Sequence, residues 1–240
     1  MEGSIRQSVA CFERPHALVH GDETDTVLMV PGLFVKPGAL SSLGRKLHRH
    51  QFAVHYSSTF PYYNTRRLDL SAEILLRDLM WLRHGVGVKS LWLVAHSNGG
   101  LISLLALAAA EQIQAKKVLD MVRGVITMSV PFGGSPVARM VRWAVPAARD
   151  IVPGAPLLDR VRKNTAWVRY CLYSGSDYIV PLQSQQLPDA PFKLMEDFEH
   201  MDYFVGREEK INRTAGAIAG WINNHGDRQT GSDKTGGATD

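Results

Sequence analysis

The sequence Ser90-Leu-Trp-Leu-Val-Ala-His-Ser-Asn-Gly-Gly100 decides the fold class of this chain. It begins with a short apolar run that is typical of a buried strand, and the nearly apolar residues 101–112 that follow are typical of a buried helix. Ser97 lies between the two, with the small residues Ala95 and Gly99 two positions away on either side. Bulky side chains there would clash in a tight turn from strand to helix, so the pattern predicts a nucleophile elbow.

Short apolar runs alternate with segments of helical period along most of the chain. The strand candidates are residues 26–30, 52–57, 90–94, 122–129 and 168–173. The helix candidates are residues 40–48, 70–83, 101–112 and 208–223. Because consecutive βα units place parallel strands in one sheet, we predict an α/β fold with a mostly parallel central sheet and helices on both faces.

Length and composition fit one soluble globular domain. The chain has 240 residues, of which 45% are hydrophobic and 21% are charged. We expect one domain over residues 1–225 and a disordered tail over residues 226–240, which hold no large apolar side chain. The net charge of +4 is too small over this length to indicate a nucleic-acid-binding protein.

The cysteines and the N-terminal segment bear on cofactors and location. Cys11 and Cys171 belong to no CxxC motif or Cys/His cluster, so we expect neither a zinc site nor a disulfide framework. The N-terminal segment lacks the basic start, the apolar run and the cleavage site of a signal peptide. The longest apolar stretch is much shorter than the roughly 20 residues that a membrane-spanning helix needs. We therefore expect a cytoplasmic protein, with attachment to a membrane surface as the alternative.

Four separated segments resemble lipases and esterases of the α/β-hydrolase superfamily, in the order that the family has them. The first is the Ser97 turn. The second, Val30-Pro-Gly-Leu33, is similar to the His-Gly-Leu segment of bacterial-type lipases. The third, Met128-Ser-Val-Pro-Phe-Gly-Gly-Ser-Pro136, is similar to a Gly-Thr-Pro-x-x-Gly-Ser stretch. The fourth joins Tyr173-Ser-Gly-Ser-Asp-Tyr-Ile-Val-Pro181 with Glu199-His-Met201, and the resemblance extends to triacylglycerol lipases and to lipases similar to GPI-inositol deacylases.

The resemblance implies a catalytic triad of Ser97, Asp177 and His200, since the triad of this fold runs in the order Ser, acid, His. A serine hydroxyl is a poor nucleophile near neutral pH. His200 would therefore take its proton, and Asp177 would hold the imidazole in the correct tautomer. The implied activity is hydrolysis of carboxylic esters, lipase-like on acyl lipids, through an acyl-enzyme on Ser97 and without a metal or cofactor.

The resemblance also implies an oxyanion hole made of the backbone N–H groups of Leu33 and Asn98. Pro31 replaces the histidine that the family has before the glycine. Because the donor is a backbone amide one residue beyond that glycine, the replacement does not remove it.

Each role has competitors in the sequence. A solvated turn residue is the simpler interpretation of Asp177, and a permissive turn before a helix is the simpler interpretation of the glycines after Ser97. Other acids lie too close to His200 in sequence or in an irregular segment: Asp197, Glu199, Asp150 and Asp159. Most other histidines precede Ser97 and would break the chain order: His16, His20, His48, His50, His55 and His84. His96 fits a packing role, and His225 ends the last helix.

Residues 133–170 interrupt the βα rhythm and hold most of the excess charge. They carry seven basic residues and two acidic ones, so this segment has a net charge of +5 and the rest of the chain −1. Apolar side chains at helical spacing predict a short helical cap at about residues 133–167: Val137, Met140, Val141, Ala144 and Val145. The cap either forms an acyl pocket that touches anionic lipid, or is solvated and packs its apolar stripe on the core.

Two other functions stay open at this point. An acyltransferase or lipid deacylase can use the same scaffold, because an alcohol can intercept the acyl-enzyme in place of water. A catalytically silent binding protein of the same fold is the alternative from another class. The expected partner is a small acyl ester or lipid, and the oligomeric state stays unknown.

Overall fold

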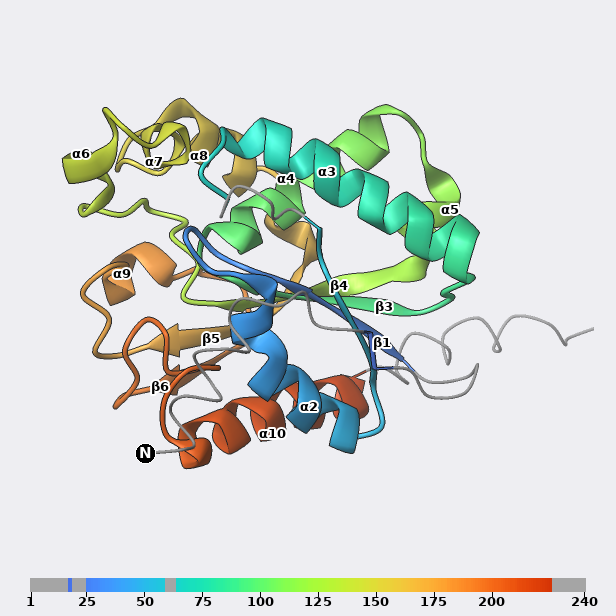
Figure 1. Cartoon of the computed structure of the whole chain (residues 1–240). Coiled ribbons are helices and arrows are strands. Elements are labelled where there is room, and N and C mark those ends of the chain that lie inside the picture. Colours follow the sequence, from blue (N-terminus) through green and yellow to red (C-terminus); the bar gives the residue numbers. More distant parts are fainter. Residues whose placement is uncertain (1–16, 19–24, 59–63, 226–240) are drawn as a thin grey trace, which may run out of the picture.

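The computed structural model describes residues 17–18, 25–58 and 64–225, and a six-stranded parallel sheet forms its centre (Figure 1). The strands are β1 (Thr26–Val30), β2 (Ala53–Tyr56), β3 (Leu91–His96), β4 (Val122–Met128), β5 (Val168–Ser174) and β6 (Phe192–Met195). Their order across the sheet is β2-β1-β3-β4-β5-β6, and every neighbouring pair is parallel. From β1 the chain adds β2 on one side, and then returns to add β3 and the later strands on the other side, so the topological switch point lies between β1 and β3. Open α/β sheets bind ligands at the carboxyl ends of such a strand pair.

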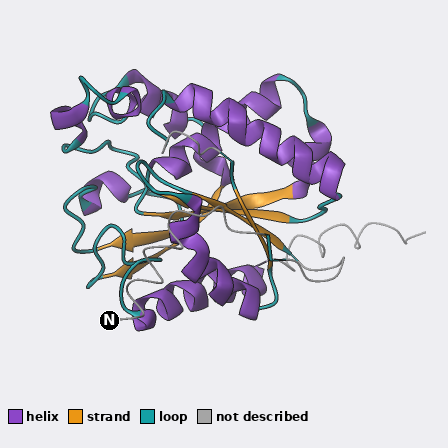
Figure 2. Ribbon diagram, viewed as in Figure 1, coloured by secondary structure: helices purple, strands orange, loops and turns teal. Residues whose placement is uncertain are grey.

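Helices cover both faces of the sheet (Figure 2). The long helices are α2 (Ser41–Arg49), α3 (Leu68–Trp81), α4 (Asn98–Gln112) and α10 (Glu208–His225). The short helices are η1 (Pro37–Leu40), α5 (Lys116–Met121), α6 (Ala138–Val141), α7 (Pro146–Asp150), α8 (Pro156–Arg162), η3 (Thr165–Trp167) and α9 (Leu182–Gln185), and the π-helical turn η2 (Leu82–Val86) extends α3.

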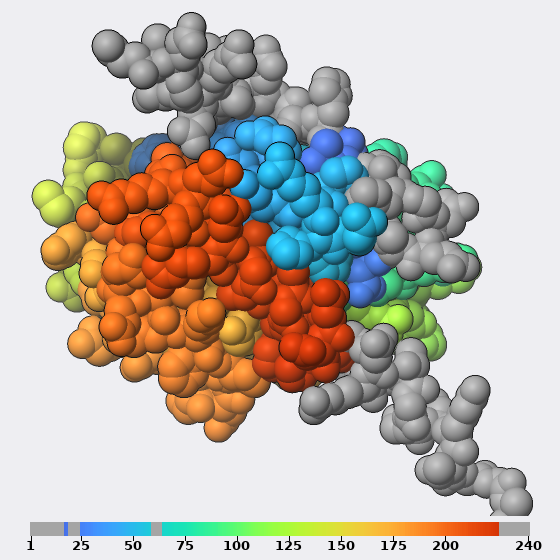
Figure 3. Space-filling model, turned by 90° about the horizontal axis from the view of Figure 1, so that it is seen from below, coloured from blue at the N-terminus to red at the C-terminus, as the bar shows by residue number. Residues whose placement is uncertain are grey.

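Two hydrophobic cores lie on opposite faces of the sheet because side chains alternate along each strand. Leu28 and Leu93 point into the core that α3, α4 and α8 cover. Val27 and Val94 point into the other core, which α2 and α10 cover. Figure 3 shows α2 and α10 side by side over this second face. Helix α4 is buried almost all round, as its continuous apolar sequence predicts.

The predicted parallel sheet and its layers are confirmed, and the differences lie at the edges. Strand β6 was not predicted, because three of its four residues are exposed at the edge of the sheet and show no buried apolar pattern. Before β1, Leu18 and Val54 exchange backbone hydrogen bonds in one antiparallel bridge. The tail predicted over residues 226–240 lies outside the described residues.

The segment predicted as a helical cap contains three short helices, α6, α7 and α8, instead of one amphipathic helix (Figure 1). Helix α6 ends at Val141, and Pro146 separates it from α7, because a residue before proline avoids helical angles and Val145 is extended, with φ −115° and ψ 106°. The predicted apolar stripe is therefore wrong as a single face. Val141 and Val145 pack partly on the core, whereas Met140 is 75% exposed.

Across the described part of the chain, no helix combines the length and the apolar character that crossing a membrane would require.

Candidate active site

Ser97 occupies a strained turn between β3 and α4. Its backbone has φ 52° and ψ −132°, a conformation that residues with a side chain rarely adopt. The turn is fixed by a hydrogen bond of 2.9 Å from the Ser97 N–H to the carbonyl oxygen of Met128. A Cβ atom on Gly99 would lie 2.7 Å from the carbonyl oxygens of Val30 and Pro31, so only glycine fits there. The elbow predicted from the small flanking residues is therefore present. Ser97 as a residue is only 5% exposed.

The loop after β1 runs directly against this elbow. A Cβ atom on Gly32 would lie 2.7 Å from the Cβ of Ser97. The side-chain amide of Asn64 holds the loop in place by donating a 2.7 Å hydrogen bond to the carbonyl oxygen of Pro31. Asn64 was not singled out in the sequence, since its partner lies 33 positions away.

Two backbone N–H groups beside Ser97 are available to a ligand. Asn98 is the first residue of α4, and the first N–H groups of a helix have no intrahelical acceptor. Leu33 follows Gly32, and its N–H donates to no other group within the described ranges. These are the two donors that the family resemblance implies for an oxyanion hole, and their roles are part of the proposal below.

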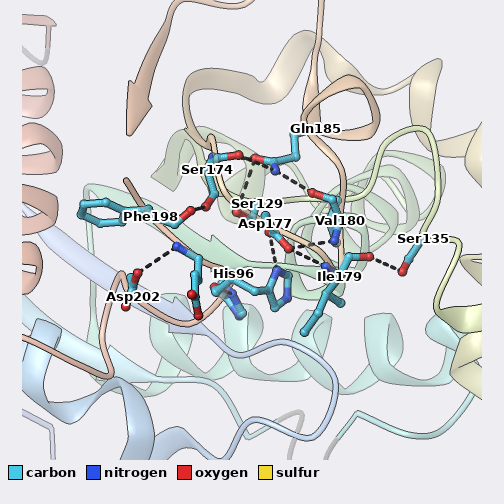
Figure 4. A network of polar contacts seen from close by, with 12 residues as sticks. His96, Ser129, Ser135, Ser174, Asp177, Ile179, Val180, Gln185, Phe198 and Asp202 are labelled. Atoms are coloured by element: carbon cyan, nitrogen blue, oxygen red, sulfur yellow. Dashed lines mark hydrogen bonds and ion pairs between the residues drawn. The ribbon is translucent and has the colours of Figure 1, made fainter. Parts of the chain in front are cut away.

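His200 and Asp177 form a buried hydrogen-bonded pair. Nδ1 of His200 lies 2.7 Å from Oδ2 of Asp177, and the two side chains are 9% and 0% exposed. An ionised carboxylate only accepts hydrogen bonds, so this contact places the proton on Nδ1 and leaves the lone pair on Nε2. The other Asp177 oxygen accepts the backbone N–H groups of Ile179 and Val180, each at 2.8 Å (Figure 4). The turn itself thus orients the carboxylate.

His96 connects the elbow to the loop that carries His200. Its Nε2 atom donates a 2.8 Å hydrogen bond to the carbonyl oxygen of His200, and the two rings lie 4.6 Å apart between centroids. Burial, and next the nearby charge of His200, lower the pKa of His96 well below its usual range, so it stays neutral. His96 therefore has the packing role that the sequence suggested. It also places Ser97, the next residue in the chain, beside the His200 loop.

Gln185 holds the turn that carries Asp177, and nothing in the local sequence singled it out. Its Nε2 atom donates to the carbonyl oxygens of Val180, at 2.7 Å, and Ser174, at 3.1 Å. Its Oε1 atom accepts from the backbone N–H of Ser174 at 2.8 Å and from the hydroxyl of Ser129 at 3.3 Å (Figure 4). Gln185 is fully buried with all four contacts made, so it joins the end of β5 to the far side of the acid turn.

Ser135 attaches the glycine-rich loop after β4 to the same turn. Its hydroxyl donates to the carbonyl oxygen of Ile179 at 2.5 Å, and its backbone N–H donates to the carbonyl oxygen of Ile151 at 2.7 Å. The third segment of the sequence resemblance therefore supports the site at both of its ends: Met128 accepts the Ser97 N–H, and Ser135 bonds the acid turn.

The rejected acids have other partners. Three of them form ion pairs away from His200: Asp150 with Arg67, Asp159 with Arg162 and Asp197 with Arg213. Asp150 also accepts the backbone N–H of Leu68 at 2.9 Å, which places its charge at the start of α3. Over residues 17–18, 25–58 and 64–225, no three His, Cys, Asp or Glu side chains gather into a group that could hold a metal ion.

The parallel sheet with its reversal between β1 and β3, and the strained serine between β3 and α4, define the α/β-hydrolase fold. Solved structures of lipases and esterases share this fold. The mature lipase BlEst2 of Bacillus licheniformis is 16% identical, with a TM-score of 0.65 over 85% of this chain and 95% of that one.

Two further structures share the fold at similar distance. Phospholipase PlaB of Legionella pneumophila is 14% identical, with a TM-score of 0.67 over 83% of this chain and 58% of that one. Est1E of Butyrivibrio proteoclasticus is 14% identical, with a TM-score of 0.60 over 85% of this chain and 90% of that one. No family model and no curated protein matches the sequence. The relationship is thus one of fold.

Proposed function

We propose that this protein is a serine hydrolase that cleaves carboxylic esters through an acyl-enzyme on Ser97. One observation carries the proposal: the strained Ser97 stands beside the loop whose His200 is oriented by the buried Asp177. The lipases and esterases among the structural neighbours support the same class of reaction.

The reaction would proceed in two matched halves. The hydroxyl oxygen of Ser97 attacks the ester carbonyl while Nε2 of His200 takes its proton, and the same proton then goes to the leaving alcohol. Asp177 keeps Nδ1 protonated and stabilises the imidazolium. Water, activated by His200, then cleaves the acyl-enzyme. Proton transfer of this kind contributes about 10²- to 10⁴-fold in rate.

The oxyanion would be held by the N–H groups of Leu33 and Asn98. Each such donor is worth about 10²- to 10³-fold in rate, because it points at charge that exists only in the transition state. Among the described residues, no hydrogen bond links the hydroxyl of Ser97 to Nε2 of His200. In enzymes without bound substrate, the distance between nucleophile and base is often longer than a hydrogen bond.

An apolar acyl group is the substrate that the surroundings favour. Phe34 follows Leu33 directly and is 57% exposed, and Tyr178 follows Asp177 and is 84% exposed. Exposed aromatic and aliphatic side chains beside polar site residues are typical of sites that bind apolar ligands. A lipase-like preference for acyl lipids is therefore part of the proposal, and so is contact of the cap with anionic lipid.

Hydrolysis of p-nitrophenyl esters with acyl chains of increasing length tests the activity. We expect turnover by the wild type, a preference for longer acyl chains, and loss in Ser97→Ala and His200→Ala. Ser103→Ala is the matched control, because Ser103 is a buried serine of α4 whose hydroxyl bonds the carbonyl oxygen of Gly99. Absence of turnover in the folded wild type would favour a silent binding protein of this fold.

Acyl transfer is the second candidate reaction. Adding a short alcohol and analysing the products separates it from hydrolysis: a new ester in large excess over free acid indicates a transferase, and free acid indicates a hydrolase.

A further inference from the structure

The cap forms an open cavity of about 480 Å³ that the proposed reaction does not use. Its lining consists of Arg142, Trp143, Arg149, Val152, Pro153, Gly154, Ala155 and Pro156. The cavity thus combines two guanidinium groups with an indole and an aliphatic wall, and no acidic side chain lines it. Its volume falls in the range of about 300 to 1,000 Å³ that small-molecule sites occupy.

The two arginines of this cavity lack the carboxylate partners that neighbouring arginines have. Arg160 pairs with Asp69 and Arg162 pairs with Asp159. Within the described residues, no carboxylate lies at ion-pair distance from Arg142 or Arg149. The nearest acid in sequence is Asp150, and its carboxylate is engaged by Arg67 and by the start of α3.

Arg149 is held in place by the chain that forms the cavity. Its Nε atom donates to the carbonyl oxygen of Arg142 at 2.8 Å, and Nη2 donates to that of Trp143 at 3.4 Å. A guanidinium has five N–H donors, so these two bonds leave three on Arg149 that no group among the described residues accepts, and an anion could take them. Trp143 is fixed as well, because its indole N–H donates to the carbonyl oxygen of Met140 at 3.1 Å.

The cavity is attached to the candidate active site. A Cβ atom on Gly134 would lie 2.7 Å from Cα of Pro153, so the wall of the cavity packs on the loop after β4. Ser135 in that loop bonds both Ile151, beside the wall, and Ile179, in the acid turn. The cavity wall and the acid turn are therefore joined through Gly134 and Ser135.

We propose that this cavity binds a phosphate group carried on an apolar molecule, with the phosphate on Arg142 and Arg149 and the apolar part on Trp143 and the proline wall. Arginine presents paired donors that match phosphate oxygens. The aliphatic wall and the indole favour a phospholipid over free inorganic phosphate. Binding itself does not require that Ser97 is a nucleophile, so the proposal is independent of the hydrolase assignment.

Calorimetric titration of the full chain with dihexanoylphosphatidylglycerol below its micelle concentration tests the site, with inorganic phosphate as a second probe. Sedimentation with phosphatidylcholine vesicles that contain or lack phosphatidylglycerol tests a bilayer as the source. We expect Arg142→Gln and Arg149→Gln to weaken binding of the lipid at least about fivefold, the effect of one arginine near an anionic headgroup. Ala155→Asp is a second variant: it places a carboxylate in the cavity and an N-cap residue before α8, so it should weaken binding without loss of stability.

Arg139→Gln is the matched control, because it removes the same charge from α6 outside the cavity. Binding of the monomeric lipid alone supports a site for single molecules, and binding of vesicles that depends on Arg142 supports a site for a bilayer headgroup. Absence of binding to both lipid forms, or an equal loss in Arg139→Gln, overturns the proposal. Ser97→Ala should bind as the wild type does, which keeps this result separate from the test of hydrolysis.

Discussion

Gly32 and Ser97 are in closer backbone contact than a side chain at position 32 would permit. A Cβ atom on Gly32 would lie 2.7 Å from Cβ of Ser97 and 2.9 Å from Nδ1 of His96. Strands β1 and β3 are neighbours, so the loops at their carboxyl ends meet at this point. The contact places Leu33, the next residue, beside the serine turn, where the proposed oxyanion donor would have to lie.

Gly32→Ala should therefore lower kcat strongly, by about 10²-fold, because the loop must move away and one oxyanion donor moves with it. Gly216→Ala in α10 is the control, since a Cβ atom there meets nothing within 4 Å. That control should keep full activity and gain roughly 0.5–1 kcal/mol of stability from the better helix former. Steady-state kinetics and thermal unfolding of both variants measure the difference. Equal kcat values for Gly32→Ala and Gly216→Ala would contradict the role of the loop.

Asn98→Ala should change little, in contrast to Ser97→Ala. The Asn98 side chain is buried and neither of its polar atoms has a partner in the described part of the chain, so its removal costs no hydrogen bond. The backbone donor stays in place. We expect kcat/KM of Asn98→Ala within about fivefold of wild type, against a loss of at least about 10³-fold in Ser97→Ala. Comparable losses in the two variants would refute the oxyanion assignment.

Gln185→Leu should loosen the turn of Asp177 and lower both kcat and the free energy of unfolding. It leaves buried backbone groups of Ser174 and Val180 unpaired, each of which costs about 1–3 kcal/mol. A purely structural residue would lower stability without altering the pH dependence of kcat, so the pH profile is the decisive readout.

Gln185→Glu gives that test a second form. An ionised carboxylate accepts but cannot donate to the carbonyl oxygens of Ser174 and Val180, whereas the protonated acid donates once. The stability deficit of this variant relative to wild type should shrink as the pH falls. A deficit that does not change with pH would show that the two donated bonds are unimportant.

The lowered pKa of His96 predicts that the free energy of unfolding depends on pH. Its pKa in the folded protein lies well below that of the unfolded chain, so between the two values only the unfolded chain binds the proton. The free energy of unfolding should therefore fall as the pH drops below the usual histidine pKa, by up to about 1.4 kcal/mol per pH unit. His96→Gln keeps a donor for the carbonyl oxygen of His200 and should remove this part of the slope. Urea unfolding at pH 7.5 and 5.5 measures it, and parallel curves for the two proteins would contradict the burial argument.

The parts of the site that were predictable are those with local requirements. The elbow at Ser97 needs small residues two positions away and a strand and helix on either side, all of which a short segment of sequence displays. The pairing of Asp177 with His200 could be predicted only from the family resemblance, because the contact joins residues 23 positions apart. The sheet followed from apolar runs that are buried on both faces.

The parts that were not predictable depend on distant partners or on exposed edges. Gln185 contacts Ser129 across 56 positions, and one of several glutamines in the short segment 182–187 carries no local signal of burial. Strand β6 is an exposed edge, so its residues lack the apolar run of the inner strands. The cap differs from the prediction because α6 ends at Val141 and a separate helix begins at Pro146 after the extended Val145, a break that hydrophobic spacing alone does not show.

Covalent labelling of Ser97 by a fluorophosphonate tests the central claim most directly, because the reagent reacts only with a serine that a neighbouring base activates. Mass spectrometry of the intact chain and of its peptides locates the adduct. We predict one adduct on Ser97 in the wild type and in Ser103→Ala, and none in His200→Ala. A folded wild type that stays unlabelled, or label that persists at Ser97 in His200→Ala, would contradict the assignment of this pair as nucleophile and base.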